Sequence, residues 1–130
     1  MRIVLLYAAL LALLFVGLSL RTLRMRRRLR IAIGDANHPT MARAMRVHAN
    51  FAEYVPFGLL LIYFVEATGA GSLFVHALGA SLFAGRIIHA VGVSQVNENY
   101  ALRTTGMALT LAPLVAAAVR LLSVYLAGSA

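Results

Sequence analysis

The chain has 130 residues, and its composition, with 62% hydrophobic and only 12% charged residues, is typical of a membrane protein rather than of a soluble domain. The twelve basic side chains are all arginine, and with four acidic residues they leave a net charge of +8, which on so apolar a chain favours membrane topology and anion binding over nucleic-acid binding. Cysteine is absent, which excludes a disulfide framework, a thiolate metal site and a cysteine nucleophile, so any thiol must come with a substrate.

Four apolar segments follow one another along the chain, and each has the roughly 20 residues that cross a bilayer. They run from about 3 to 23, 41 to 67, 72 to 91 and 100 to 126, and the first is expected to continue as helix into the arginine run behind it. We interpret the first as a retained helix rather than a signal peptide, because its positive charge follows the apolar run. The sequence therefore predicts an all-α membrane protein, a bundle of four transmembrane helices in a single domain over residues 1–130.

The connections between the segments are short. Thr40, at the end of the first loop, is expected to cap the second helix, and Gly69-Ala70-Gly71 predicts a tight turn after it. Glu66 lies toward the far end of the second helix, where we expect it to reach the membrane interface. Pro113 interrupts the fourth helix, and a neighbouring helix is expected to satisfy the carbonyl that the proline leaves without a donor.

Arginines concentrate around the first loop and predict the orientation of the bundle. The positive-inside rule places this loop in the cytoplasm, and an even number of spans then places both termini outside. The run from Arg24 to Arg30 is most simply a topology signal that also contacts anionic lipid headgroups. Polar residues of all four helices meet on this side of the membrane, whereas scattered structural polar residues would not converge at one depth. The flanking arginines are Arg21, Arg24, Arg26, Arg27, Arg28, Arg30, Arg43 and Arg46.

The second helix carries a polar stripe near the edge of the bilayer. Arg46, Asn50 and Glu53 are spaced i, i+4 and i+7, so they share one helical face, and both signs of charge suit a small zwitterionic ligand. Structural alternatives stay open: Arg46 and Glu53 can pair within the helix, and Glu53 can neutralise an arginine of the third or fourth helix. His89, three residues after Arg86, can be a histidine with satisfied hydrogen bonds at a helix interface.

The same stretch contains the motif Arg46-x-x-x-Asn50-x-x-Glu53-Tyr54-x-Pro56, which resembles the second membrane helix of the MAPEG family, the membrane-associated proteins in eicosanoid and glutathione metabolism. Gly85-Arg86-Ile87-Ile88-His89 is similar to the end of the third helix in prostaglandin-forming members. Arg103-Thr104, with Pro113 ten residues on, is similar to the start of their fourth helix, and Arg24-x-Arg26 falls where the family has arginines. The resemblance covers essentially the whole chain, and the compact loops look like those of short bacterial members.

The resemblance implies a homotrimer with a glutathione site between neighbouring subunits near the cytoplasmic face, and no metal. Arg103 resembles the arginine that stabilises the glutathione thiolate and lowers the pKa of that thiol, and is the implied catalytic residue. Two positions depart from the pattern, since Val93 and Met107 stand where related synthases carry tyrosines. The implied glutathione-binding residues are Arg46, Asn50, Glu53, Tyr54, Arg86 and His89, with Arg26 and His48 reaching in from the adjacent subunit.

The leading functional hypothesis is an integral, multi-pass protein of a bacterial inner membrane that binds glutathione as substrate or cofactor. It would act as a glutathione transferase or peroxidase on a lipophilic second substrate that enters from the lipid bilayer, and it would not bind nucleic acid. One alternative is a family relative that kept the binding site without turnover. Another is a small anion channel or carrier, which the absence of inverted repeats and broken helix pairs disfavours.

Overall fold

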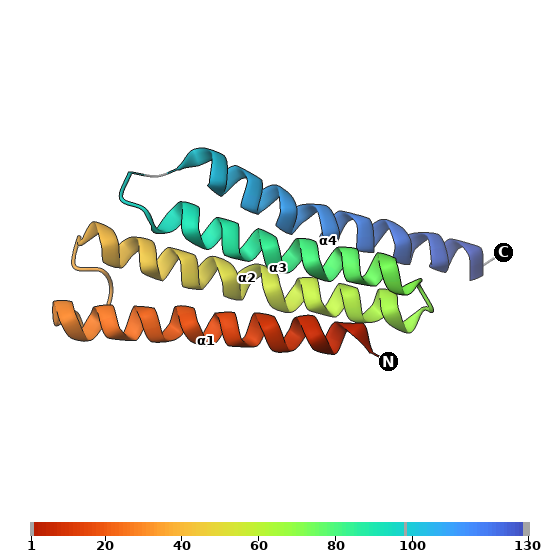
Figure 1. Cartoon of the computed structure of the whole chain (residues 1–130), viewed down its shortest axis with the longest axis horizontal. Coiled ribbons are helices and arrows are strands. Elements are labelled where there is room, and N and C mark those ends of the chain that lie inside the picture. The colour runs from red at the N-terminus through yellow and green to blue at the C-terminus, as the bar shows by residue number, and fades with distance from the viewer. Residues whose placement is uncertain (1, 98, 129–130) are drawn as a thin grey trace.

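The computed structural model describes residues 2–97 and 99–128, and these residues form four antiparallel helices and no strand. Both termini lie at one end of the bundle, and the α1–α2 and α3–α4 connections lie at the other, here termed the loop end (Figure 1). The predicted all-α bundle is confirmed, and the first helix continues through the arginine run as expected. The helices are α1 (Ile3–Leu29), α2 (Pro39–Ala67), α3 (Ser72–Ser94) and α4 (Tyr100–Gly128).

Three helices in the described part of the chain, α1, α3 and α4, are long and apolar enough to cross a membrane. The sequence predicts α2 as a fourth span, and α2 is as long as α4, but charged residues such as Arg43, Arg46 and Glu53 make its first half polar. Its second half is apolar and packs beside α1 and α3. The polar half of α2 therefore lies at the loop end, where the arginines also gather.

Two helix termini have contacts that the sequence did not indicate. Thr40 does not cap α2: the N-cap is His38, Pro39 occupies the first turn, and the Thr40 hydroxyl contacts His38 Nδ1 at 2.9 Å. Proline at this position starts a helix earlier than the apolar pattern indicates, because its fixed φ suits the first turn and it has no N–H to satisfy. Glu66, at the other end of α2, has partners that the sequence did not indicate. Its carboxylate accepts the backbone N–H groups of Ile3 and of Val4 (3.0 Å), so it caps α1 from the neighbouring helix.

The proline in α4 is accommodated as predicted. Pro113 lies inside the helix, so the carbonyl of Leu109, four residues earlier, receives no helical hydrogen bond. Ser81 of α3 donates its hydroxyl to that carbonyl at 2.8 Å. The α4 helix thus stays continuous because its neighbour supplies the missing donor.

Close approach of α3 to its neighbours depends on glycine. An added Cβ at Gly79 would collide with the ring of Tyr7 on α1, and one at Gly106 would collide with the backbone of His89. Between α3 and α4, a Cβ at Gly85 would lie 2.9 Å from the carbonyl carbon of Leu109. Gly79 and Gly85 therefore allow α3 to pack closely against α1 and α4 within one chain.

Candidate functional site

An open groove of about 680 Å³ lies at the loop end between α2 and α4, with α3 as its floor. Its volume is within the roughly 300–1,000 Å³ range of small-molecule sites. Its lining is Pro39, Ala42, Arg43, Arg46, Asn50 and Tyr54 of α2, His89 and Val93 of α3, and Arg103 and Met107 of α4. Side chains from three helices, distant in sequence, therefore face one recess.

Five of the predicted site residues meet in this groove: Arg46, Asn50, Tyr54, His89 and Arg103. On α2 the groove follows the row i, i+4, i+8, which winds around a helix by about 40° at each step because 3.6 residues make a turn. At the depth of Tyr54, the groove therefore no longer follows the face of α2 that carries Arg46. Glu53 is exposed outside the groove lining for this reason, although the i, i+7 spacing predicts one shared stripe.

Arg86 lies directly behind the groove and is only 1% exposed. Its Nη2 donates to Asn50 Oδ1 at 2.8 Å and to His89 Nδ1 at 2.9 Å, and its Nη1 donates to Thr110 Oγ1 at 3.2 Å. The guanidinium also lies over the ring of Tyr54, 5.9 Å from the centroid. A single buried cation thereby joins α2, α3 and α4 at the base of the groove.

These bonds determine which hydrogen-bonding groups the floor can offer. A guanidinium only donates, so Asn50 Oδ1 and His89 Nδ1 must accept, and neutral His89 carries its proton on Nε2. The tautomer and the amide orientation follow from the network rather than from visible hydrogens. The side-chain NH₂ of Asn50 and the Nε2–H of His89 are both donors. With Arg43, Arg46 and Arg103 in the lining, the groove is rich in donors and suits carboxylate groups.

Arg86 is incompletely satisfied. Its Nε is buried and has no hydrogen-bond partner within residues 2–97 and 99–128. Glu53 is close enough to interact with the Arg86 charge electrostatically, but no carboxylate in that part of the chain forms a hydrogen bond with it. The predicted role of Glu53 as a partner of an arginine on another helix is thus present only as a longer-range interaction.

Two predicted site residues contact other parts of the chain. Arg26 donates through Nη1 to the carbonyls of Ala32 (3.3 Å) and Gly34 (3.0 Å) and so holds the first loop against the end of α1. The ring of His48 stacks on Phe15 of α1, with centroids 4.7 Å apart. Neither lines the groove of its own chain, and their predicted role in the site of an adjacent subunit stays a prediction.

Some residues at the site were not expected from the sequence. Arg43 lines the groove, and its position three residues before Arg46 could have indicated this. Thr110 binds Arg86, a contact that becomes evident only once α3 and α4 are packed. Val93 and Met107, which the sequence had already indicated as departures from the motif pattern, both line the groove. The described residues contain no group of three or more His, Asp or Glu side chains that could hold a metal ion.

Comparisons of the sequence with known proteins identify the family of this chain. The model of the MAPEG family matches residues 4–123. The inner membrane protein YecN of Escherichia coli K12 is 37% identical over 105 residues, which cover 81% of this chain and 79% of YecN, and YecN of Escherichia coli O6:H1 matches equally. No solved structure matches. With three apolar helices of spanning length and an inner-membrane relative, the chain is a multi-pass integral membrane protein, and it belongs to the MAPEG family.

Proposed function

We propose that this protein binds glutathione in the groove between α2 and α4 and acts as a glutathione transferase or peroxidase on lipophilic electrophiles. The donor-rich groove is the observation that carries the proposal. Glutathione has two carboxylates, which match arginines such as Arg46 and the amide donor of Asn50. Because the arginines cluster at the loop end, the positive-inside rule supports a cytoplasmic groove.

The proposed chemistry begins with the glutathione thiolate. Arg103, at the start of α4, is the groove cation best placed by the motif to stabilise the negative sulfur and lower the pKa of the thiol. In the transferase reaction the sulfur forms a bond to an electrophilic carbon, and the leaving group departs with the bonding electron pair. Because both α3 and α4 are membrane-spanning helices, a lipophilic substrate can approach the sulfur from the bilayer side.

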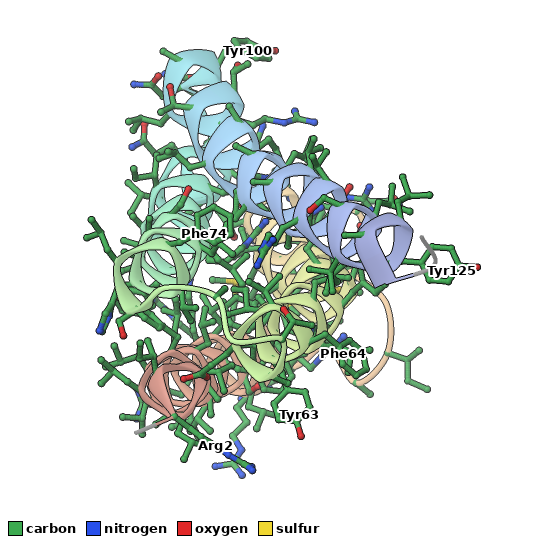
Figure 2. The ribbon with its side chains drawn as sticks, turned by 90° about the vertical axis from the view of Figure 1, so that its right-hand side faces the viewer. Arg2, Tyr63, Phe64, Phe74, Tyr100 and Tyr125 are labelled. Atoms are coloured by element: carbon green, nitrogen blue, oxygen red, sulfur yellow. The ribbon has the colours of Figure 1, made fainter. Side chains whose placement is uncertain are left out.

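We propose further that three subunits assemble. One face of α2 is apolar and exposed, with Phe57, Leu60, Tyr63 and Phe64 at helical spacing, and Figure 2 shows Tyr63 and Phe64 pointing away from the bundle. Glu53 is exposed on the same helix, and a carboxylate facing hydrocarbon is costly. A neighbouring subunit that covers this face and brings a cation or the glutathione amine to Glu53 removes that cost.

A mass measurement of the complex in mild detergent tests this assembly. A trimer is the expected result. A stable monomer that binds glutathione with undiminished affinity contradicts a site shared between subunits, even if the groove itself is correct.

A second candidate function is glutathione binding without turnover. Val93 and Met107 line the groove but lack the hydroxyl groups that related synthases have at these positions. In this alternative the groove keeps the donors that bind carboxylates but lacks the hydroxyl groups at these two positions.

Calorimetry with glutathione tests binding first. Arg46→Gln removes a charge-assisted bond, worth about 1.5–3 kcal/mol, so affinity should fall about ten- to a hundredfold. The matched control Arg27→Gln removes the same charge from an exposed site outside the groove and should bind like the unsubstituted protein. Equal loss in both variants, or no heat of binding in either, rejects the groove as the site. Binding without conversion of a generic aryl halide favours the second candidate.

A further inference from the structure

A second recess lies at the loop end on the α1 side. It has a volume of about 520 Å³, and it shares no lining residue with the groove between α2 and α4. Three arginines on one face of α1 dominate it, at the spacing i, i+3, i+7. Its lining is Arg21, Arg24, Met25, Arg28 and Leu29 of α1, with His38 and Thr40 at the start of α2. No lining residue is acidic, so the recess presents positive charge on an apolar base.

The arginines of this region divide by what they contact. Arg21 donates to Ser94 Oγ, and Arg43 donates to the carbonyl of Val93 at 3.2 Å, so both support the end of α3. Arg26 holds the first loop. Arg24 and Arg28 are exposed, and neither forms a hydrogen bond or ion pair with another described residue. A topology signal requires only positive charge near the membrane. Arg24 and Arg28 in addition line the same recess, which such a signal does not require.

The depth of the recess indicates its partner. The apolar run from residue 3 to residue 20 rises by about 27 Å at 1.5 Å per residue, close to the roughly 30 Å hydrocarbon thickness of a bilayer. Arg24 and Arg28 then follow about 6 and 12 Å beyond the end of that run. Since the headgroup layer is about 5–8 Å thick on each side, Arg24 lies within it and the long Arg28 side chain can reach back to it.

We propose that this recess binds the phosphate of an anionic phospholipid headgroup. The guanidinium groups of Arg24 and Arg28 donate to the phosphate oxygens, an arrangement in which arginine forms paired bonds. Arg21 adds charge at the base, and His38 and Thr40 offer polar contacts from α2. Met25 and Leu29 form the apolar base of the recess beneath these donors. A bound lipid then fastens the end of α1 to the start of α2 and fixes how deep the bundle lies in the membrane.

Mass measurement of the whole protein with bound lipid tests the proposal. Protein in detergent is titrated with phosphatidylglycerol or with phosphatidylcholine. Two double variants are compared, Arg24→Gln with Arg28→Gln, and the control Arg27→Gln with Arg30→Gln. Each removes two positive charges from the C-terminal end of α1 or its C-cap, but the control pair lies outside the recess. Circular dichroism and thermal unfolding establish that both variants fold.

The expected result is preferential binding of phosphatidylglycerol to the unsubstituted protein and to the control, with at least about tenfold weaker binding in the Arg24/Arg28 variant. Equal loss in both variants shows a response to net charge and overturns the site. Equal binding of both lipids overturns it as well. Inorganic phosphate is the third probe: if it binds the recess as tightly as the lipid does, the source of the phosphate is not the membrane and the lipid assignment is overturned.

Discussion

Replacing Arg86 with lysine keeps the buried positive charge but changes the arrangement of its hydrogen-bond donors. Arg86 binds Asn50 and His89 through one terminal nitrogen and Thr110 through the other. A lysine ammonium has its three donors on a single nitrogen, so it cannot keep all of these partners. Loss of one hydrogen bond to a charged group costs about 1.5–3 kcal/mol, which the free energy of unfolding should register.

The same substitution should weaken glutathione binding, although Arg86 does not line the groove. In Arg86→Lys the side chains of Asn50 and His89 are no longer both held as donors. Ordering a side chain on binding costs about 0.5–1.5 kcal/mol, so releasing both should lower affinity by about 1–3 kcal/mol, roughly five- to a hundredfold. Calorimetry measures the affinity, and the ¹⁵N chemical shifts of His89 report whether its proton still resides on Nε2.

Thr110→Val is the matched control. It removes one acceptor of Arg86 but leaves the bonds to Asn50 and His89, and Thr110 does not line the groove. This variant should lose stability while it keeps its affinity within about twofold, because the floor donors remain oriented. If Arg86→Lys binds glutathione normally with unchanged His89 shifts, or if Thr110→Val weakens binding equally, Arg86 does not orient the floor of the groove.

Four further outcomes follow from the contacts described. Glu53→Gln should lower glutathione affinity about ten- to a hundredfold if Glu53 receives the ligand amine, whereas loss of trimer with normal binding shows a structural counter-ion instead. Glu66→Gln should lower the free energy of unfolding by about 0.5–2 kcal/mol, because the charged cap of α1 is lost. An unchanged free energy of unfolding contradicts that role. Gly106→Ala should destabilise the bundle by about 1–3 kcal/mol, since its methyl group meets the backbone of His89, whereas Gly17→Ala, with open space around it, should not. A reporter fused after Ala130 should act outside the cytoplasm, and cytoplasmic activity reverses the orientation.

The sequence predicted the fold well because helix length and apolar content are local properties. Each apolar segment forms one helix, and the Leu109 carbonyl, which Pro113 cannot bond, accepts a hydrogen bond from a neighbouring helix. The wrong N-cap at Thr40 and the unforeseen partners of Glu66 both lie at helix ends. There a preceding proline, or the end of another helix, decided the contact, and neither is visible in apolar periodicity.

The site was predicted in composition but less well in geometry. Polar residues of α2, α3 and α4 do meet at one end, as their positions along the helices indicate. The spacing could not show that the groove follows the i+4 row and leaves Glu53 outside. It also could not show that Arg86 is buried, because that depends on Asn50 and Thr110 from two other helices. Arg26 has local partners in the first loop that its motif position does not reveal.

The most direct test of glutathione activation in the groove is the thiolate absorbance of bound glutathione as a function of pH. A free cysteine thiol has a pKa near 8.5. With the unsubstituted protein, we expect thiolate absorbance already at neutral pH, because the pKa of the bound thiol is lowered by about one unit or more. In Arg103→Gln, that pKa should return toward the value of the free thiol. A bound thiol that titrates like free glutathione, or an unchanged titration in Arg103→Gln, contradicts the proposed activation.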